Sequence, residues 1–552
     1  MNNKKMRNII RGVFLFLLGI LLNHINISAA EISVTAQNFP DDNFRNYISQ
    51  EIDKDKNGVL SDTEIGETTK IVTLGDRRGE QYNAKDYQGI GYFTELEELQ
   101  IEAVVPRDPN SEADCDYELS ISLDVSANTK LKRLVCRASE IQKLDLSVLP
   151  LLEEINLEAG ECPIQDLSKH VNLKKVCLNV NTEFILPEQM PLLEEFRLSW
   201  DMFKKNKPPA IDFSASANLS VLELRTGDYS NRQLDLKNLK KIKKLVFSPY
   251  CAVQELRSIA VNLEGCSGLE MAEIHNVDKI NFQGCNNIKE LSLNSKLPEL
   301  NLSNLVNLEN LDCTHLDGRL LDIRNSKELR NVHIRTSNFG EILFPDKASF
   351  QQILIEQNLQ LTKLDLSGVQ VEKLSCKGNK NLQELLLSKD GTYKEVLATE
   401  NKLAKLDLRG IKVDSLNCDR NHLKTLLLSK NGKYKKISVK QNKLAKLDLR
   451  GIKLNSICAD RNRITKLFLS KSGKYGEILL AYNRLTKLDL RGIKVKVMDC
   501  KNNKLRSLKV RGNKVLKELY CQKNRLKTLD VRKCRKLKIL QTAGNKKLKK
   551  KK

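Results

Sequence analysis

The segment KLDLRGIKVDSLNC, which begins at Lys405, is repeated with few changes in the C-terminal third of the chain. Its relatives KLDLSGVQVEKLSC, KLDLRGIKLNSICA and KLDLRGIKVKVMDC begin at Lys363, Lys446 and Lys487, so the four starts are 42, 41 and 41 residues apart. A constant period of this length is the sequence signature of a repeat architecture, in which neighbouring units stack to bury a shared core.

Asparagine divides each of these units in two. Around each asparagine the frame is L-x-x-L-x-L/C-x-x-N-x-L, as in VDSLNCDRNHL from Val413. This frame is the leucine-rich-repeat signature. A short strand points alternate side chains inward, and the asparagine side chain can bond to backbone groups left open at the following turn. The asparagines, 20 to 22 residues apart, are Asn379, Asn401, Asn421, Asn442, Asn462, Asn483, Asn503, Asn524 and Asn545.

Weaker copies of the frame continue upstream, so the sequence predicts a solenoid of about 20 short coils from roughly Leu96 to Leu548. Parallel strands are expected on the concave side. The far side reads Leu-x-Leu, as at Leu406 and Leu408, which indicates an extended or tightly turning convex side rather than long helices. We place the solenoid at residues 71–545, irregular and acidic to about 360 and regular and basic after it, followed by a lysine-rich tail at 546–552.

The 14 cysteines of the chain fit this solenoid better than a disulfide framework. Inward cysteines in a strand stack behave as small apolar residues, and neighbouring parallel strands give poor geometry for a bridge. We expect mostly buried free thiols, with a disulfide between neighbours such as Cys500 and Cys521 as the alternative. The cysteines at the inward third apolar position are Cys136, Cys313, Cys376, Cys418, Cys500 and Cys521.

These cysteines, together with the LDLS and LDLR segments between them, resemble the cysteine-ladder type of internalin, a family of Gram-positive (Firmicutes) surface leucine-rich-repeat proteins. The resemblance covers most of the chain after residue 30. It implies an adhesin-like role in host contact, which the fold alone does not establish. The chain departs from that family in its strongly basic C-terminal part.

A motif for a metal site precedes the repeats. Residues 53–64 read DKDKNGVLSDTE, with oxygen-bearing residues at loop positions 1, 3, 5, 7, 9 and 12 and Gly58 at the sharp turn. Oxygen ligands at this spacing suit a hard cation of the size of Ca²⁺. The alternative is a solvated acidic turn without metal. The expected ligands are Asp53, Asp55, Asn57, Val59 through its carbonyl, Ser61 and Glu64.

A capped amphipathic helix is expected over residues 42–48, ahead of this loop. The whole segment NFPDDNFRNYISQEIDKDKNGVLSDTEI resembles the EF-hand-like cap that precedes the repeats in secreted leucine-rich-repeat proteins of anaerobic Firmicutes. The resemblance implies a small helical cap at residues 31–70 with one structural Ca²⁺. Because only one such loop is found, whereas EF-hands usually pair, the loop could pack on the first coil instead.

The N-terminus has the pattern of an export signal. Lys4, Lys5, Arg7 and Arg11 precede a short apolar run, and the small residues Ser28-Ala29-Ala30 follow it. This pattern predicts a signal peptide at residues 1–30 and an extracellular protein. The alternative is an uncleaved N-terminal anchor. No second apolar run long enough to span a membrane is seen in the sequence.

Charge is unevenly distributed along the chain. Residues 361–552 hold 52 Lys and Arg against 16 Asp and Glu, a net charge of +36; since the whole chain carries +24, residues 1–360 carry −12. A cation follows most of the nine asparagines of the repeat frame, which we call the ladder asparagines. Arg409, Arg450 and Arg491 form a second regular series on the other side of the coils. The cations proposed to bind a polyanion are Lys402, Lys443, Arg463, Arg484, Lys504 and Arg525.

Two interpretations of this row remain open. Duplication of a parent unit could have copied its charges, which then serve only solubility. Alternatively, cations at regular intervals along a rigid rod suit a linear anionic polymer and release its counterions. The expected partners are a host surface protein, an anionic polysaccharide such as a host glycosaminoglycan, extracellular DNA, or the teichoic acid of the cell's own wall. Binding to teichoic acid would retain the secreted protein at the surface by charge.

No catalytic motif is found. A Gly-rich phosphate loop, Gly-x-Ser-x-Gly and His-Glu-x-x-His are all missing from the sequence, so we expect no enzyme activity. Trp200 and the insertion at residues 104–117 are weak candidates for ligand contact. The alternative to an adhesin-like binder is a structural cell-surface protein that self-associates without a specific host ligand.

Overall fold

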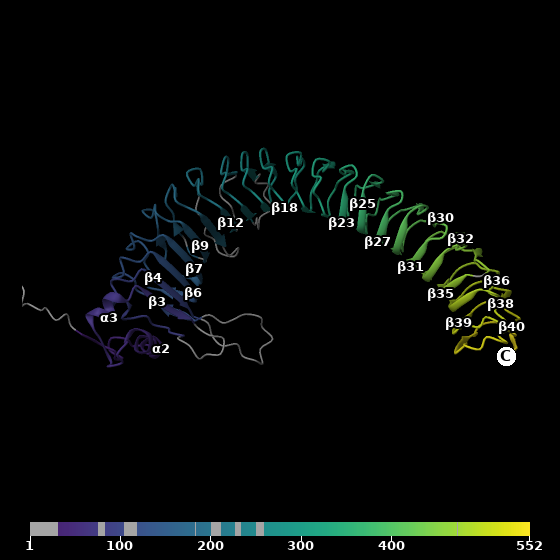
Figure 1. Cartoon of the computed structure of the whole chain (residues 1–552), viewed down its shortest axis with the longest axis horizontal. Coiled ribbons are helices and arrows are strands. Elements are labelled where there is room, and N and C mark those ends of the chain that lie inside the picture. The colour runs from purple at the N-terminus through teal and green to yellow at the C-terminus, as the bar shows by residue number, and fades with distance from the viewer. Residues whose placement is uncertain are drawn as a thin grey trace, which may run out of the picture. The chain divides into compact units, whose positions relative to one another are not determined.

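The computed structural model describes residues 31–74, 83–103, 119–180, 182, 184–199, 211–226, 233–249, 259–471 and 473–551. The expected signal peptide, the insertion at residues 104–117 and Trp200 lie outside these ranges. The chain forms two compact units, Met1–Ile211 and Asp212–Lys552. Figure 1 labels their elements. The change from acidic to basic sequence near residue 360 therefore falls inside the second unit.

The first unit begins with a small cap. Asp41 starts its first helix by accepting hydrogen bonds from the backbone N–H groups of Asn43 and Phe44. The predicted helix over 42–48 is therefore present, and it continues as a turn of π-helix. The cap elements are β1 (Ile32–Ser33), α2 (Asp42–Tyr47), η1 (Ile48–Ile52), β2 (Val59–Leu60) and α3 (Asp62–Glu67).

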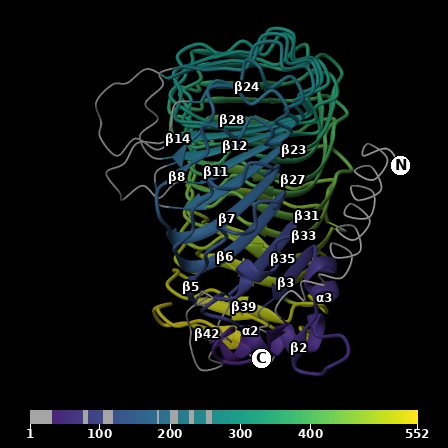
Figure 2. The same cartoon turned by 90° about the vertical axis from the view of Figure 1, so that its left-hand side faces the viewer.

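A ladder of parallel strands follows the cap in the first unit, each strand pairing with the next (Figure 2). The ladder begins before the first predicted coil, because the segment KIVTL alternates buried and exposed residues and Ile71 pairs with Leu99. Its strands are β3 (Lys70–Leu74), β4 (Glu98–Glu102), β6 (Arg133–Gln142), β7 (Glu154–Glu161), β9 (Lys175–Val180) and β11 (Glu195–Ser199). Shorter elements beside them are η2 (Ile90–Tyr92), β5 (Ser120–Ser122), β8 (Gln165–Asp166) and β10 (Phe184–Ile185).

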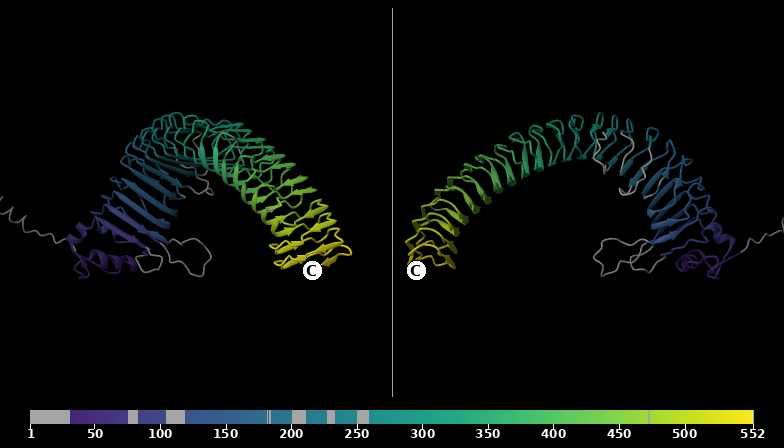
Figure 3. Two further views of the ribbon diagram at one scale, coloured as in Figure 1. Left: turned by 45° about the vertical axis from the view of Figure 1, so that its right-hand side comes forward. Right: turned by 180° about the vertical axis from the view of Figure 1, so that it is seen from behind.

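The second unit holds a longer parallel ladder, which lines the inner side of that unit's curve (Figure 3). Its strands are β12 (Val221–Thr226), β14 (Lys244–Pro249), β16 (Met271–His275), β18 (Glu290–Asn294), β19 (Asn310–Thr314), β21 (Asn331–Arg335), β23 (Ser349–Glu356), β25 (Gln370–Ser375), β27 (Thr392–Leu397), β29 (Lys412–Asn417), β31 (Lys433–Ser438), β33 (Lys453–Cys458), β35 (Lys474–Leu479), β37 (Lys494–Asp499), β39 (Glu518–Tyr520) and β41 (Ile539–Gln541). The predicted leucine-rich-repeat solenoid is confirmed.

The convex side of the second unit carries short strands that pair in parallel, mostly two coils at a time, matching the 41-residue period. They confirm the expected extended convex side. The expected lysine-rich tail supplies the last of them. The convex strands are β13 (Gln233–Asp235), β15 (Ala260–Asn262), β17 (Lys279–Asn281), β20 (Leu320–Asp322), β22 (Glu341–Leu343), β24 (Lys363–Leu366), β26 (Glu384–Leu387), β28 (Lys405–Asp407), β30 (Thr425–Leu427), β32 (Lys446–Asp448), β34 (Lys466–Phe468), β36 (Lys487–Asp489), β38 (Ser507–Lys509), β40 (Thr528–Asp530) and β42 (Lys549–Lys551).

The core between the two sides is a continuous column of apolar side chains. Leu374, Val396, Leu416 and Ile437 occupy one register position in four successive strands, and all are buried. Each such side chain contributes roughly 1.5–3 kcal/mol of burial free energy, but only where a neighbouring coil covers it. The stack therefore depends on its neighbours for stability. In the described residues no helix has the length and apolar character of a membrane span.

Cysteines are part of this core. The described cysteines are free thiols, most of them buried, as expected from the sequence. Burial raises the pKa of Cys376 to about 12 and that of Cys418 well above its usual value. The ladder thiols are therefore protonated at neutral pH and pack as small apolar groups.

Candidate functional site

The first candidate site is the acidic loop of the cap. The carboxylates of Asp53, Asp55 and Glu64 lie within 4.8 Å of one another. Asp53 and Glu64 are buried, with only 2% and 8% of their surface exposed. Three carboxylates at this separation repel one another unless donors or a cation compensate them.

Backbone N–H groups supply part of that compensation. The N–H of Asn57 donates to Asp53 Oδ1 at 3.2 Å, and the N–H of Gly58 donates to Asp53 Oδ2 at 3.0 Å. Gly58 has φ +79°, a left-handed conformation that favours glycine. The N–H of Val59 donates to Asn57 Oδ1 at 2.7 Å. The loop thus holds its oxygens in place through its own backbone.

Glu64 closes the loop by a second set of hydrogen bonds. Its Oε2 accepts from the Ser61 N–H at 2.9 Å and from the Ser61 hydroxyl at 2.8 Å, while its Oε1 accepts from the Lys54 N–H at 2.8 Å. These bonds, that from the Ser61 N–H first, lower the pKa of Glu64. The donor set is entirely oxygen and includes an ionised carboxylate, which fits a hard divalent cation of the Ca²⁺ type.

The loop strand β2 pairs with an element that sequence reasoning missed. Leu60 is opposite Ile32 and Val59 is opposite Ser33, in an antiparallel pair with β1. In the described part of the chain, β2 therefore pairs with β1 and not with the strand of a second loop. The cap contacts the first strand of the solenoid through α2, because the Tyr47 hydroxyl accepts a hydrogen bond from the Val72 N–H of β3 at 3.1 Å.

The second candidate site lies at the exit edge of the second unit, where the ladder strands end and the asparagines follow. Asn442 Nδ2 donates to the Cys418 carbonyl of the preceding coil at 2.9 Å, and Asn442 Oδ1 accepts from the Leu423 N–H at 2.9 Å. Each asparagine therefore ties two coils together. The same pair of contacts is made by Asn421, Asn462, Asn483, Asn503, Asn524 and Asn545.

The residue after each asparagine from Asn401 to Asn524 is fixed by a further backbone bond. The Lys443 N–H donates to the Leu423 carbonyl at 3.0 Å and the Arg484 N–H to the Ile464 carbonyl at 2.9 Å. The six predicted cations thus stand in one register position, with His422 in the coil between the first two. We call them the basic row: Lys402, Lys443, Arg463, Arg484, Lys504 and Arg525.

The side chains of the basic row remain available to a ligand. Five are exposed and Lys443 is half-buried. Across the residues that the structure describes, none of the six takes part in an ion pair, although Lys402 Nζ donates to Asn381 Oδ1 at 2.8 Å. Since adjacent strands lie about 4.8 Å apart, the row places like charges at nearly that interval from Lys443 to Arg525.

The arginines on the other side of the coils behave differently. Arg409 Nε and Nη2 donate to the two carboxylate oxygens of Asp407 at 2.9 and 2.6 Å, and this pair lowers the pKa of Asp407. Arg450 and Arg491 pair with the aspartates two residues before them in the same way. The second row suggested by the sequence is therefore neutralised by its own aspartates. The Asp-x-Arg spacing in the repeats that begin at Lys405, Lys446 and Lys487 is the signal that could have shown this.

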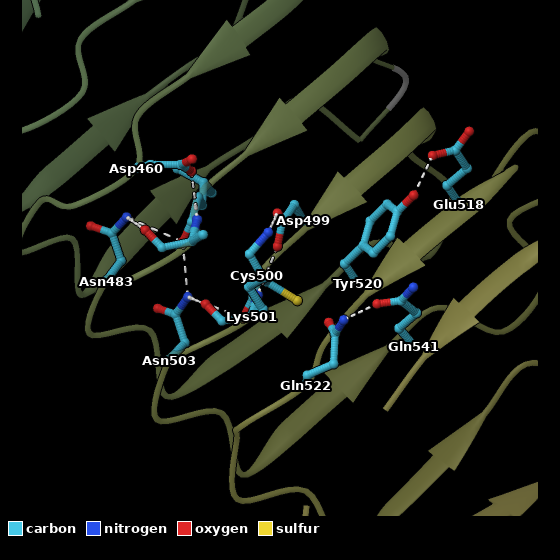
Figure 4. A network of polar contacts seen from close by, with 12 residues as sticks. Asp460, Asn483, Asp499, Cys500, Lys501, Asn503, Glu518, Tyr520, Gln522 and Gln541 are labelled. Atoms are coloured by element: carbon cyan, nitrogen blue, oxygen red, sulfur yellow. Dashed lines mark hydrogen bonds and ion pairs between the residues drawn. The ribbon is translucent and has the colours of Figure 1, made fainter. Parts of the chain in front are cut away.

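Charges at the ends of the concave strands also compensate one another (Figure 4). Asp499 accepts from Lys501 through its backbone N–H at 3.0 Å and its Nζ at 2.7 Å. Asp460 accepts from the Ala481 N–H at 2.7 Å, and burial raises the pKa of Asp460. The ends of the concave strands therefore carry charges of both signs.

Comparison with known proteins finds solenoids of the same kind but no close relative. Neither a family model nor a curated protein matches the chain. Among solved structures, the functional domain of InlJ from Listeria monocytogenes is 19% identical, with a TM-score of 0.41, and the match covers 76% of this chain and 83% of that one. The internalin InlF of the same species is 19% identical, with a TM-score of 0.35 and coverage of 65% and 92%.

A leucine-rich-repeat protein of Leptospira interrogans is 18% identical, with a TM-score of 0.29 and coverage of 65% and 86%. At such low identities and TM-scores, these similarities do not assign the chain to a family. The fold class rests on the strand pairing and the asparagine ladder described above.

Proposed function

We propose that this chain is a secreted or surface-associated, adhesin-like binding protein without enzyme activity, and that it holds anionic polymers along the basic row. The observation that carries the proposal is the backbone bond that fixes each cation to the preceding coil. Because the backbone of the row is already fixed, binding a long polymer has to order only the cationic side chains, and each contact releases counterions from the polymer.

The spacing of the row favours some polymers over others. Cations about 4.8 Å apart are more widely spaced than the phosphates of one strand of duplex DNA, at about 3.4 Å along the helix axis. Flexible anionic polysaccharides and teichoic acids can adapt their spacing to the row. Binding of the latter would retain the protein at its own cell surface.

The test is salt elution of the purified chain from heparin-agarose. A variant with Lys402, Arg463, Arg484, Lys504 and Arg525 changed to Gln should elute at clearly lower salt than the unchanged chain. The charge-matched control changes five exposed convex lysines to Gln: Lys405, Lys446, Lys466, Lys487 and Lys509.

The control should elute close to the unchanged chain, because its lysines lie on the convex strands. Equal shifts in both variants would mean that heparin senses only net charge, and the basic row would then have no special role. Repeating the elution from immobilised teichoic acid shows which polymer class the row prefers.

The cap belongs to the same proposal. We propose that the acidic loop binds one Ca²⁺ through Asp53, Asp55, Asn57, Val59, Ser61 and Glu64. When bound, the ion would neutralise the clustered carboxylates and brace the cap against the first strands of the solenoid. A structural role fits a single loop whose strand pairs, within the described residues, with β1 rather than with a second loop.

A further inference from the structure

A cavity of about 820 Å³ lies at the entry edge of the second unit, where the ladder strands begin. It is formed by the segments 409–414 and 428–434, which lead into β29 and β31. Its volume is within the range of about 300–1,000 Å³ found for small-molecule sites. The entry edge is opposite to the basic row along the strands, so this cavity is a separate feature.

The cavity has an apolar floor that the local sequence holds rigid. Ile411, Val413 and Tyr434 line it and are at most 4% exposed. The Tyr434 hydroxyl accepts a hydrogen bond from the Ser429 N–H at 3.0 Å. Gly432 must be glycine, because a Cβ there would lie 2.7 Å from the tyrosine ring.

The rim of the cavity is basic. Lys412, Lys430 and Lys433 are exposed on it, and within the described part of the chain none of the three is in an ion pair. Arg409 also lines the cavity but is held by its own aspartate. One carboxylate, that of Asp414, lies on the rim and pairs with Lys435 at 2.8 Å.

We propose that this cavity binds a uronic acid residue of an acidic polysaccharide. The lysines would take its carboxylate, the apolar floor would take the C–H face of the sugar ring, and Asp414 with Asn431 would meet its hydroxyls. A carboxylate on the rim accepts hydrogen bonds from hydroxyl groups, and it repels a phosphate dianion more strongly than the single negative charge of a uronic acid. The mixture of groups therefore favours a hydroxylated carboxylate over a phosphorylated ligand.

The neighbouring repeat units show which residues the fold accepts at two of these lysine positions. In the preceding unit Gln370 and Thr392 stand where Lys412 and Lys433 stand here, while Tyr393 keeps the same contact with the Ser388 N–H at 3.2 Å. The fold therefore accepts Gln and Thr at these positions. In the following unit, lysines recur at the equivalent positions 453 and 474.

The experiment is calorimetric titration of the purified full chain with trigalacturonic acid. Lys412→Gln and Lys433→Thr, combined with Lys453→Gln and Lys474→Thr, should weaken binding roughly tenfold or more, because charge-assisted hydrogen bonds to the carboxylate are lost. The control changes four convex lysines to Gln: Lys405, Lys446, Lys466 and Lys487. It should stay within about twofold of the unchanged chain.

Equal weakening in the entry-edge variant and the convex control would overturn the proposal, as would equal affinity for maltotriose, which carries no carboxylate, or for inorganic phosphate. The five-residue variant of the basic row should bind trigalacturonic acid as the unchanged chain does. The entry-edge variant should likewise keep its elution from immobilised teichoic acid, whose negative charges are phosphates rather than uronic acid carboxylates. The two sites can therefore fail independently.

Discussion

At the scale of the residue, the ladder asparagine is the side chain that joins neighbouring coils by hydrogen bonds. It follows a residue with positive φ in each of the regular coils, so the chain enters the turn through a left-handed conformation that costs most side chains about 1–2 kcal/mol. The asparagine amide then satisfies carbonyls of two coils and a backbone N–H. The left-handed residues are Glu400, Arg420, Gln441, Arg461, Tyr482, Asn502 and Lys523.

Asn442→Ala should therefore lower the free energy of unfolding by about 2–3 kcal/mol. The change leaves the buried Cys418 carbonyl and Leu423 N–H without their side-chain partner, and each such group costs about 1–3 kcal/mol. Urea unfolding followed by circular dichroism measures the difference.

The control for this change is Gln441→Ala. Gln441 is exposed and, among the described residues, its side chain forms a hydrogen bond only with Arg420, so its loss should cost less than about 1 kcal/mol. If both variants were destabilised to the same extent, the ladder bonds would not be a main source of stability.

At the scale of the element, the cap shows how a short strand can substitute for a missing partner. Strand β2 has only two residues, and its one neighbour in the described part of the chain is β1. Such a small pair is weak by itself, so the proposed ion would contribute much of the local stability.

Adding 10 mM Ca²⁺ should stabilise the cap by about 1.4–2.7 kcal/mol if the dissociation constant lies in the range of roughly 0.1–1 mM usual for extracellular modules. Differential scanning calorimetry with Ca²⁺ and with EDTA measures the shift. Asp53→Asn should abolish it.

Asp62→Asn is the matched control, because Asp62 is exposed and lies outside the set of expected ligands. It should keep the Ca²⁺ response. A shift of the same size with Mg²⁺, or one that survives in Asp53→Asn, would argue against a calcium site at this loop.

At the scale of the whole molecule, charge separates the chain into regions of opposite sign. The net charge of +36 on residues 361–552 opposes their own compact stacking, and salt screens that repulsion. Raising NaCl from 0.01 to 1 M should therefore raise the melting temperature of the second unit.

Light scattering over the same salt range tests the alternative of a self-associating structural protein. Pairing of acidic and basic regions between molecules would give oligomers at 0.01 M NaCl that dissociate at 1 M. A monomer at both salt concentrations would leave the binding function as the better explanation of the charge.

Much of the fold and of the basic row could be predicted, because in a repeat protein the spacing of recurring residues gives the length of each coil. The spacing of Asn421 and Asn442 indicated one coil per 20 to 22 residues, and the cation after most of the asparagines indicated one charge in most coils. The alternation in β3 was present in the sequence too, but its partner Leu99 lies 28 residues after Ile71, outside the regular period.

The sequence by itself determined the solenoid, the inward cysteines, the acidic loop and the positions of the basic row, because each depends on local spacing. Only the tertiary structure decided which charges stay free. Arg409 and Arg463 are equally basic in the sequence, yet the first is held by Asp407 while the second has no ion-pair partner among the described residues. It also decided that β1 completes the loop strand and that a cavity opens beside Lys412, since such contacts join residues that only folding brings together.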